Sequence, residues 1–148
     1  MGTVGLWSLV RFLHVAGAVL WVGGQLALSL VVLPLARRML SAQDRDSFAS
    51  AAGRRFGLLT GAVFLPVQLC TGWAMAWREG VTWASLTESG YGRTLAAKLA
   101  LFVVVMLAAA GHGVAHAKGR PKLARSLAVA SLVGSLGVVL LATALPAT

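Results

Sequence analysis

The sequence predicts an all-α, polytopic membrane protein, an up-down bundle of four transmembrane helices with both termini outside. The chain has 148 residues, of which 58% are hydrophobic and 11% are charged, whereas a soluble domain carries about 25% charged residues. Its apolar residues fall into four long stretches, and most of its basic residues lie in the connections between them. This composition excludes a soluble enzyme and a disordered tail, and the length suits a single domain over residues 1–148.

The four apolar stretches cover about residues 4–36, 56–77, 94–117 and 123–145. The last three each have roughly the ~20 residues that cross a bilayer core, and the first is longer. Helix is the expected state because backbone amides in lipid must be satisfied within their own segment. In the first connection, about residues 37–55, we expect a short surface helix capped by Ser41. The other connections are short, so consecutive helices are expected to be antiparallel neighbours.

The distribution of Lys and Arg predicts the orientation of these helices. Basic residues gather in the first and third connections, as Arg37, Arg38, Arg45, Arg54, Arg55, Lys118, Arg120, Lys122 and Arg125. The second connection has Arg78 and Arg93, which Glu79 and Glu88 offset. The positive-inside rule then places the first and third connections in the cytoplasm and both termini outside. The lipid bilayer thus accounts for the net charge of +9, and no nucleic-acid partner is expected.

Seven polar side chains lie inside the apolar stretches, where each costs free energy to insert. They are Arg11, His14, Gln25, Gln68, Lys98, His112 and His116. No Asp or Glu lies in any of the four stretches, so a proton pump built on a membrane carboxylate is not expected.

Helical spacing places the polar and small residues of each helix on one side. These faces carry His14, Gly17, Trp21 and Gln25 on the first helix, Gly57, Gly61, Gln68 and Gly72 on the second, and Lys98, Phe102, Val105, Ala109, His112 and His116 on the third. The remaining residues are mostly Leu, Val and Ala, which suit lipid. We therefore expect these three faces to point into the bundle.

Small residues also recur four positions apart, a spacing that permits two helix backbones to approach closely. They form the steps Gly53-Gly57-Gly61, Ala130-Gly134 and Ser131-Ser135. These steps predict helix packing and carry no chemistry.

Each polar side chain has a structural alternative. His14 is either a hydrogen bond between helices or a ligand, and Lys98 either extends to the outer headgroups or carries a functional charge. We expect Arg11 to be an interfacial anchor and Gln68 to form an interhelical hydrogen bond. His112 and His116, four residues apart near the cytoplasmic boundary, are either a solvated pair or two ligands of one metal ion.

Two motifs resemble a known family. The stretch Arg11-Phe-Leu-His14-Val-Ala-Gly-Ala-Val-Leu-Trp21-Val-Gly-Gly24, followed by Leu33-Pro34-Leu-Ala-Arg37, resembles the first helix of the CopD/HemJ-type membrane proteins. The third stretch, from Lys98-Leu-Ala-Leu to Gly111-His112-Gly with basic residues after it, resembles the Lys-to-His helix of that family. The length and the four-helix layout are similar as well.

The resemblance implies a function in one of two branches. The HemJ branch binds haem b and is associated with oxidation of protoporphyrinogen IX to protoporphyrin IX, and the CopD branch with copper uptake or resistance. By resemblance, His14 is a haem axial ligand, Lys98 a required charged group and His112 a second candidate ligand. The segment from Trp21 to Gly24 is closer to the CopD branch, so whether the chain is a haem-dependent oxidoreductase stays open.

The residues themselves suit haem b. Gly17 and Gly24 beside His14 are expected to leave room for a flat macrocycle, on which Trp21 and Trp73 are available to pack. Arg11 and Lys98 are expected to neutralise its propionates. The candidate cofactor-binding residues are His14, Lys98, His112, Arg11, Trp21 and Gln68, and the candidate metal ligands are His14, His112 and His116. A quinone or another redox partner is expected, and a homo-oligomer is an open alternative.

Two alternatives to a haem protein also stay open. Copper binding of the CopD type has weak local support, because Cu(I) prefers sulfur ligands and the chain has one cysteine, Cys70, and four methionines. The single cysteine also excludes an intrachain disulfide and a paired-cysteine zinc or redox site. The other alternative is a non-catalytic membrane subunit of a larger complex, which the small-residue steps motivate.

Overall fold

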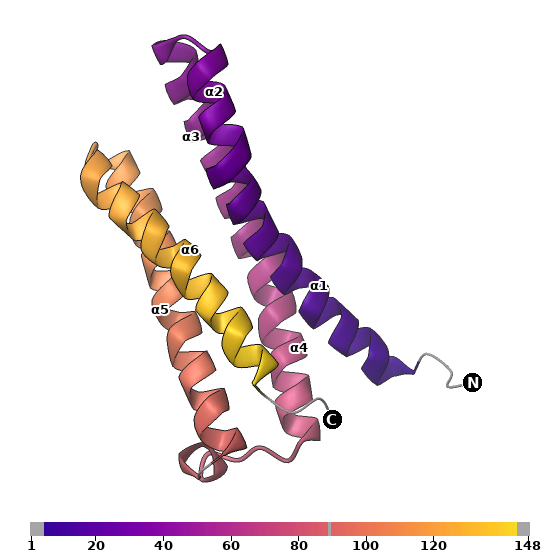
Figure 1. Cartoon of the computed structure of the whole chain (residues 1–148). Coiled ribbons are helices and arrows are strands. Elements are labelled where there is room, and N and C mark those ends of the chain that lie inside the picture. Colours follow the sequence, from indigo (N-terminus) through magenta and orange to yellow (C-terminus); the bar gives the residue numbers. More distant parts are fainter. Residues whose placement is uncertain (1–4, 89, 145–148) are drawn as a thin grey trace. The chain divides into compact units, whose positions relative to one another are not determined.

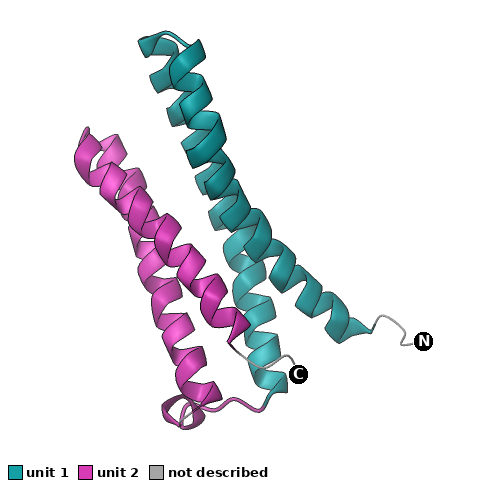
Figure 2. Cartoon of the chain, in the orientation of Figure 1, with its two compact units in different colours: residues 1–79 teal, residues 80–148 magenta. Residues whose placement is uncertain are grey.

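The computed structural model describes residues 5–88 and 90–144, and all their regular structure is helical (Figure 1). The chain divides into two compact units, residues 1–79 and residues 80–148 (Figure 2). Each unit is a hairpin of two antiparallel helical rods. The all-α fold class that the sequence predicts is confirmed.

Unit 1 is a hairpin of two long helical rods. The first rod consists of α1 (Leu6–Ala27), the π-helical segment η1 (Leu28–Val32) and α2 (Leu33–Met39). The second consists of α3 (Ala42–Leu59), the π-helical segment η2 (Thr60–Phe64) and α4 (Leu65–Arg78). The rods have 34 and 37 residues, or about 51 and about 56 Å at 1.5 Å per residue, and both lengths exceed the ~30 Å of a bilayer's hydrocarbon. Part of this hairpin therefore extends beyond the hydrocarbon.

The predicted first connection is wrong in extent. Instead of a separate short surface helix within a connection over residues 37–55, only Leu40 and Ser41 separate the two rods. The expected cap at Ser41 is confirmed, because its Oγ accepts a hydrogen bond from the backbone N–H of Asp44 at 3.2 Å. The capped helix continues without a break into the second apolar stretch, since a helix outside the hydrocarbon needs no apolar surface to keep its backbone bonded.

A proline follows each π-helical segment, Pro34 after η1 and Pro66 after η2. Proline has no N–H and clashes with the carbonyl four residues before it, which disturbs an α-helix. The residue just before each proline bonds five residues back instead. The Leu33 N–H donates to the Leu28 carbonyl, and the Leu65 N–H donates to the Thr60 carbonyl. The wider turn lets both rods continue through their prolines.

Unit 2 is a shorter hairpin, formed by α5 (Tyr91–Ala117) and α6 (Pro121–Thr143), with the short 3-10 helix η3 (Ser85–Thr87) before it. Gly119, at φ +64°, makes the turn between the two helices. The interface uses small residues: Gly134 lies directly against Val105, which is 1% exposed, and a Cβ on Gly137 would lie 3.0 Å from Leu101. The close packing predicted for the Ala130-Gly134 step is observed at Gly134, whereas Ala130 is exposed.

The glycine step of unit 1 is different. A Cβ added to Gly53, Gly57 or Gly61 would meet no atom within 4 Å. These three glycines therefore bring no neighbouring helix close within unit 1, contrary to the expectation from their spacing.

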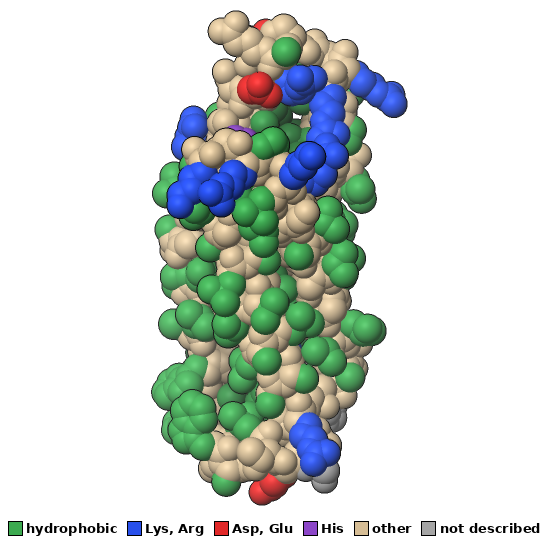
Figure 3. Space-filling model, turned by 90° about the vertical axis from the view of Figure 1, so that its left-hand side faces the viewer, with side chains coloured by type: hydrophobic (Ala, Val, Ile, Leu, Met, Phe, Trp, Pro, Cys, Tyr) green, Lys and Arg blue, Asp and Glu red, His purple; other side chains and the backbone are tan. Residues whose placement is uncertain are grey.

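The surface is that of a membrane protein. Four helices, Leu6–Met39, Ala42–Arg78, Tyr91–Ala117 and Pro121–Thr143, are long and apolar enough to cross a bilayer. Apolar side chains cover the long middle parts of the helices, and Lys and Arg lie mostly near their ends (Figure 3). The chain is a multi-pass membrane protein. The expected start of the first helix near Val4 and the expected end of the last near Leu145 lie outside the described residues.

Candidate functional site

A polar cluster joins the two rods of unit 1. His14 of α1 is half-buried, and its Nδ1 lies 2.9 Å from the hydroxyl oxygen of Thr71 on α4. Gln68, one turn before Thr71, donates from Nε2 to the backbone carbonyl of His14 at 2.7 Å. Gln68 and Thr71 are each 8% exposed, so most of this cluster is removed from the surface. The interhelical hydrogen bond expected of Gln68 is confirmed.

The Thr71 hydroxyl determines which nitrogen of His14 carries a proton. Its single hydrogen goes to the Val67 carbonyl, 2.6 Å away on the same helix. The Thr71 oxygen must therefore accept from His14, so Nδ1 is the N–H donor, and in a neutral imidazole the lone pair lies on Nε2. Ligating histidines in metal proteins have this arrangement, with one ring nitrogen donating to a neighbouring oxygen and the other basic.

Glycines bring the two rods close together at this cluster. A Cβ on Gly17 would lie 2.5 Å from the Gln68 amide nitrogen, and one on Gly72 would lie 3.3 Å from the imidazole carbon Cε1 of His14. Further along α1, a Cβ on Gly24 would lie 2.7 Å from the Phe56 ring. The prediction that Gly17 and Gly24 leave room for a macrocycle is therefore wrong, because side chains of the second rod fill both spaces.

Trp21, the expected packing partner of a cofactor, packs on a protein side chain instead. It is 6% exposed and stacks on Phe64 of η2, with ring centroids 4.7 Å apart and planes 10° from parallel. Its indole Nε1 is buried without a hydrogen-bond partner within the described part of the chain. The expected face of the first helix is confirmed for His14, Gly17 and Trp21, since all three meet the second rod.

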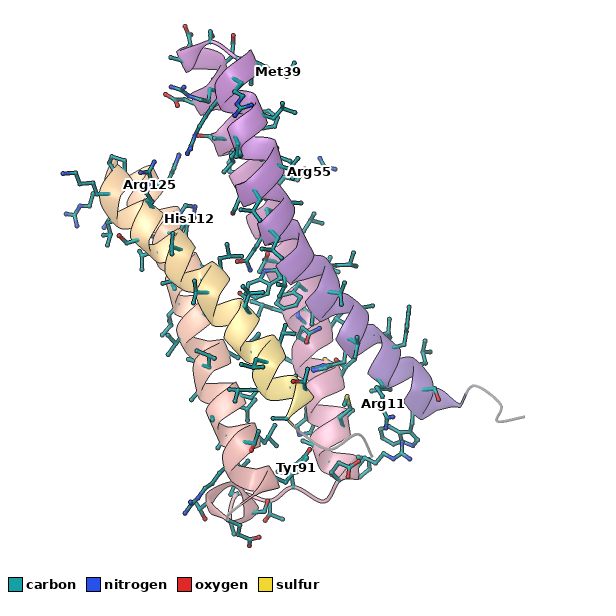
Figure 4. All side chains as sticks on the ribbon, viewed as in Figure 1. Arg11, Met39, Arg55, Tyr91, His112 and Arg125 are labelled. Carbon is teal, nitrogen blue, oxygen red and sulfur yellow. The ribbon has the colours of Figure 1, made fainter. Side chains whose placement is uncertain are left out.

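The two cationic candidates, Arg11 and Lys98, belong to different units. Arg11 is exposed on α1, three residues before His14 (Figure 4). Lys98 is half-buried on α5 and makes no hydrogen bond or ion pair among the residues that the structure describes. It lies fourteen residues before His112, which is about 21 Å along the helix. The structure therefore does not bring these two residues of unit 2 together.

His112 and His116 form a pair at the end of α5. Their ring centroids are 6.4 Å apart, and the ring planes are inclined by 51°. The His112 Nδ1 lies 2.8 Å from the backbone carbonyl of Ala124 on α6, which only accepts, so Nδ1 is again the donor. His116 is exposed. Among the described residues, no group of three or more His, Cys, Asp or Glu side chains is placed to hold one metal ion.

Two residues of the site were not predicted, Thr71 and Phe64. The spacing held a signal for Thr71, because it lies three residues after Gln68 and one before Gly72, on the predicted polar face of that helix. Phe64 is one of many apolar residues in its stretch, and only the π-helical turn at η2 positions it on Trp21.

Comparison with known proteins gives one relative. No family model matches this chain. An uncharacterized protein of Aquifex aeolicus (strain VF5) is 32% identical over 105 residues, which are 71% of this chain and 66% of the relative. The matched region therefore spans slightly less than two thirds of the relative. No solved structure matches.

Proposed function

We propose that this chain is a bacterial inner-membrane protein that binds haem b and has a redox role, as a small b-type cytochrome or as an enzyme oxidising protoporphyrinogen IX. The observation that supports it most is the orientation of His14 by Thr71, which leaves Nε2 as the basic nitrogen. An imidazole held in this way in a membrane helix suits an axial haem ligand. When bound, haem supplies reversible one-electron chemistry at its iron.

The orientation of His14 favours it as a haem ligand, whereas the surrounding side chains restrict where a macrocycle could lie. The α1–α4 interface around His14 is filled by the Gln68 amide at Gly17 and by the Phe56 ring at Gly24. A macrocycle on His14 would therefore lie outside that interface. Arg11, exposed three residues before His14 on the same helix, would neutralise a propionate there.

The remaining parts of the proposal come from the charge pattern and the family resemblance. Unit 1 carries Arg37 and Arg38 near its Leu40–Ser41 turn, and unit 2 carries Lys118 and Arg120 at its own turn. We assign both turns to the cytoplasm and both termini to the outside. By the family resemblance Lys98 is a required charged group, and a membrane quinone is the proposed electron acceptor.

An optical spectrum of the protein, purified in detergent after haem-supplemented expression, tests the proposal. We expect a Soret band that is lost in His14→Ala and retained in His116→Ala, a matched imidazole deletion in the other unit. Thr71→Val removes the orienting oxygen at nearly constant volume, and we expect it to retain haem with a shifted reduction potential. A colourless wild-type protein, or an unchanged spectrum in His14→Ala, would overturn the proposal. Haem-free protein that carries copper would support the copper alternative instead.

A further inference from the structure

We propose that His112 and His116 form a binding site for one divalent transition-metal ion at the C-terminal end of α5, separate from the haem site proposed at His14. The two residues lie on unit 2 and are one helical turn apart. Side chains at this spacing share a face of the helix, which is why two histidines four residues apart recur as paired zinc ligands.

The first ligand is already oriented. The Ala124 carbonyl accepts the Nδ1–H of His112 at 2.8 Å, which leaves the lone pair of the neutral ring on Nε2. A backbone carbonyl is one of the usual partners of a metal-ligating imidazole, because it sets the ring orientation and makes the ligating nitrogen more basic. Since Ala124 belongs to α6, this bond also joins the candidate site to the second helix of the hairpin.

The second ligand needs only a small adjustment. Two imidazoles that bind one ion at about 2.0–2.1 Å have ring centroids roughly 5–6 Å apart, depending on the angle at the metal. The observed 6.4 Å lies just beyond this range. His116 is exposed, so its ring can rotate toward His112 without displacing packed atoms.

The charges near the histidine pair have opposing effects on its affinity for a cation. His116 lies in the last turn of α5, where the carbonyl end of the helix dipole favours a cation. Lys118, Arg120 and Arg125 follow closely in the sequence and reduce the affinity for one. The balance favours ions that bind imidazole nitrogen covalently, such as Zn²⁺, Cu²⁺ and Ni²⁺, over Mg²⁺ or Ca²⁺, which prefer oxygen. Water would complete the coordination, as the described residues offer no third ligand of this kind.

Titration calorimetry of the full-length protein with Zn²⁺, in detergent and without a polyhistidine tag, tests this site. The matched control combines His116→Ala with Ala117→His, which keeps three histidines in the chain and moves one imidazole off the shared face. We expect one saturable site in the wild type. The Zn²⁺ affinity should be at least ~10-fold lower in His116→Ala and in the control, because even the loss of a residue that only orients a metal ligand lowers metal affinity about 10-fold or more. With Cu²⁺, the electron paramagnetic resonance spectrum should show coupling to two imidazole nitrogens.

Equal Zn²⁺ affinity in the wild type and the control would overturn the proposal, as would the absence of saturable binding in the millimolar range. His14→Ala distinguishes this site from the proposed haem site, because it should leave the Zn²⁺ affinity unchanged. Far-ultraviolet circular dichroism on each variant establishes that the helices are still formed.

Discussion

The two hairpins solve the same packing problem in different ways. In unit 1, α1 and α4 are joined by hydrogen bonds among His14, Gln68 and Thr71. In unit 2, α5 and α6 are joined mainly by close contact, where Gly134 meets the buried Val105. Lipid is as apolar as the helix surface, so helices associate in a membrane through tight packing or polar bonds rather than through the hydrophobic effect.

This difference in packing indicates which hairpin can hold a polar functional side chain at the lower cost in free energy. A polar group in a membrane helix is expensive, and the cost is reduced when a neighbouring helix bonds to it. Unit 1 meets this condition at His14, whose ring and carbonyl both bond to α4. In unit 2 the interface is formed by small side chains, and its histidine pair lies at the end of α5 next to the turn. The comparison predicts that unit 2 is sensitive mainly to added volume, whereas unit 1 is sensitive both to lost hydrogen bonds and to added volume at Gly17.

The largest effect should come from adding one methyl group to the α5–α6 interface. In Gly134→Ala the new Cβ would overlap the Cγ2 of Val105, which is 1% exposed, so side chain or backbone in this buried contact must shift. We expect a loss of about 1–3 kcal/mol in the free energy of unfolding, measured by titration with sodium dodecyl sulfate and circular dichroism.

Gly113→Ala is the matched control for this substitution. Gly113 lies in α5 with no atom within 4 Å of a new Cβ, so the same change should be neutral or stabilising by up to ~1 kcal/mol. Equal losses at both positions would show that the α5–α6 interface does not depend on close contact at Gly134.

A smaller effect is expected at the polar cluster of unit 1. Gln68→Ala removes the hydrogen bond to the His14 carbonyl, and interhelical hydrogen bonds in membranes contribute about 0.6 kcal/mol on average and up to ~1.7 kcal/mol. Gly17→Ala places a Cβ 2.5 Å from the same amide nitrogen and should displace it from that carbonyl.

The two changes therefore affect one bond, and a double-mutant cycle measures their coupling. Gly17→Ala should destabilise the wild type and be nearly neutral in the Gln68→Ala background. Additive losses in unfolding free energy would mean that Gly17 and Gln68 do not act through the same contact.

The fold class and one face of the polar cluster could be predicted from the sequence. The features that were missed are ones that a hydropathy pattern does not report. Hydropathy identifies only the part of a helix that suits the hydrocarbon, so it did not reveal that the helix capped by Ser41 continues without a break into the second apolar stretch. Spacing placed His14 and Gln68 on inward faces, which the structure confirms. Thr71 was missed because a threonine in a membrane helix usually bonds its own backbone, and this one does so at Val67 while also meeting His14.

The smallest effect on the unfolding free energy is expected at Gly57 of α3. Within the described part of unit 1 no other helix packs closely against this glycine, and it has no side chain to form a hydrogen bond. A Cβ on Gly57 would meet no atom within 4 Å, and alanine is the better helix former. Gly57→Ala should therefore leave the unfolding free energy unchanged or raise it by up to ~1 kcal/mol. Sedimentation in detergent should give the same mass as the wild type. A clear loss of stability, or a smaller particle, would mean that another helix packs on this glycine in the membrane, and α3 would then join the small-residue class of interface that unit 2 exemplifies.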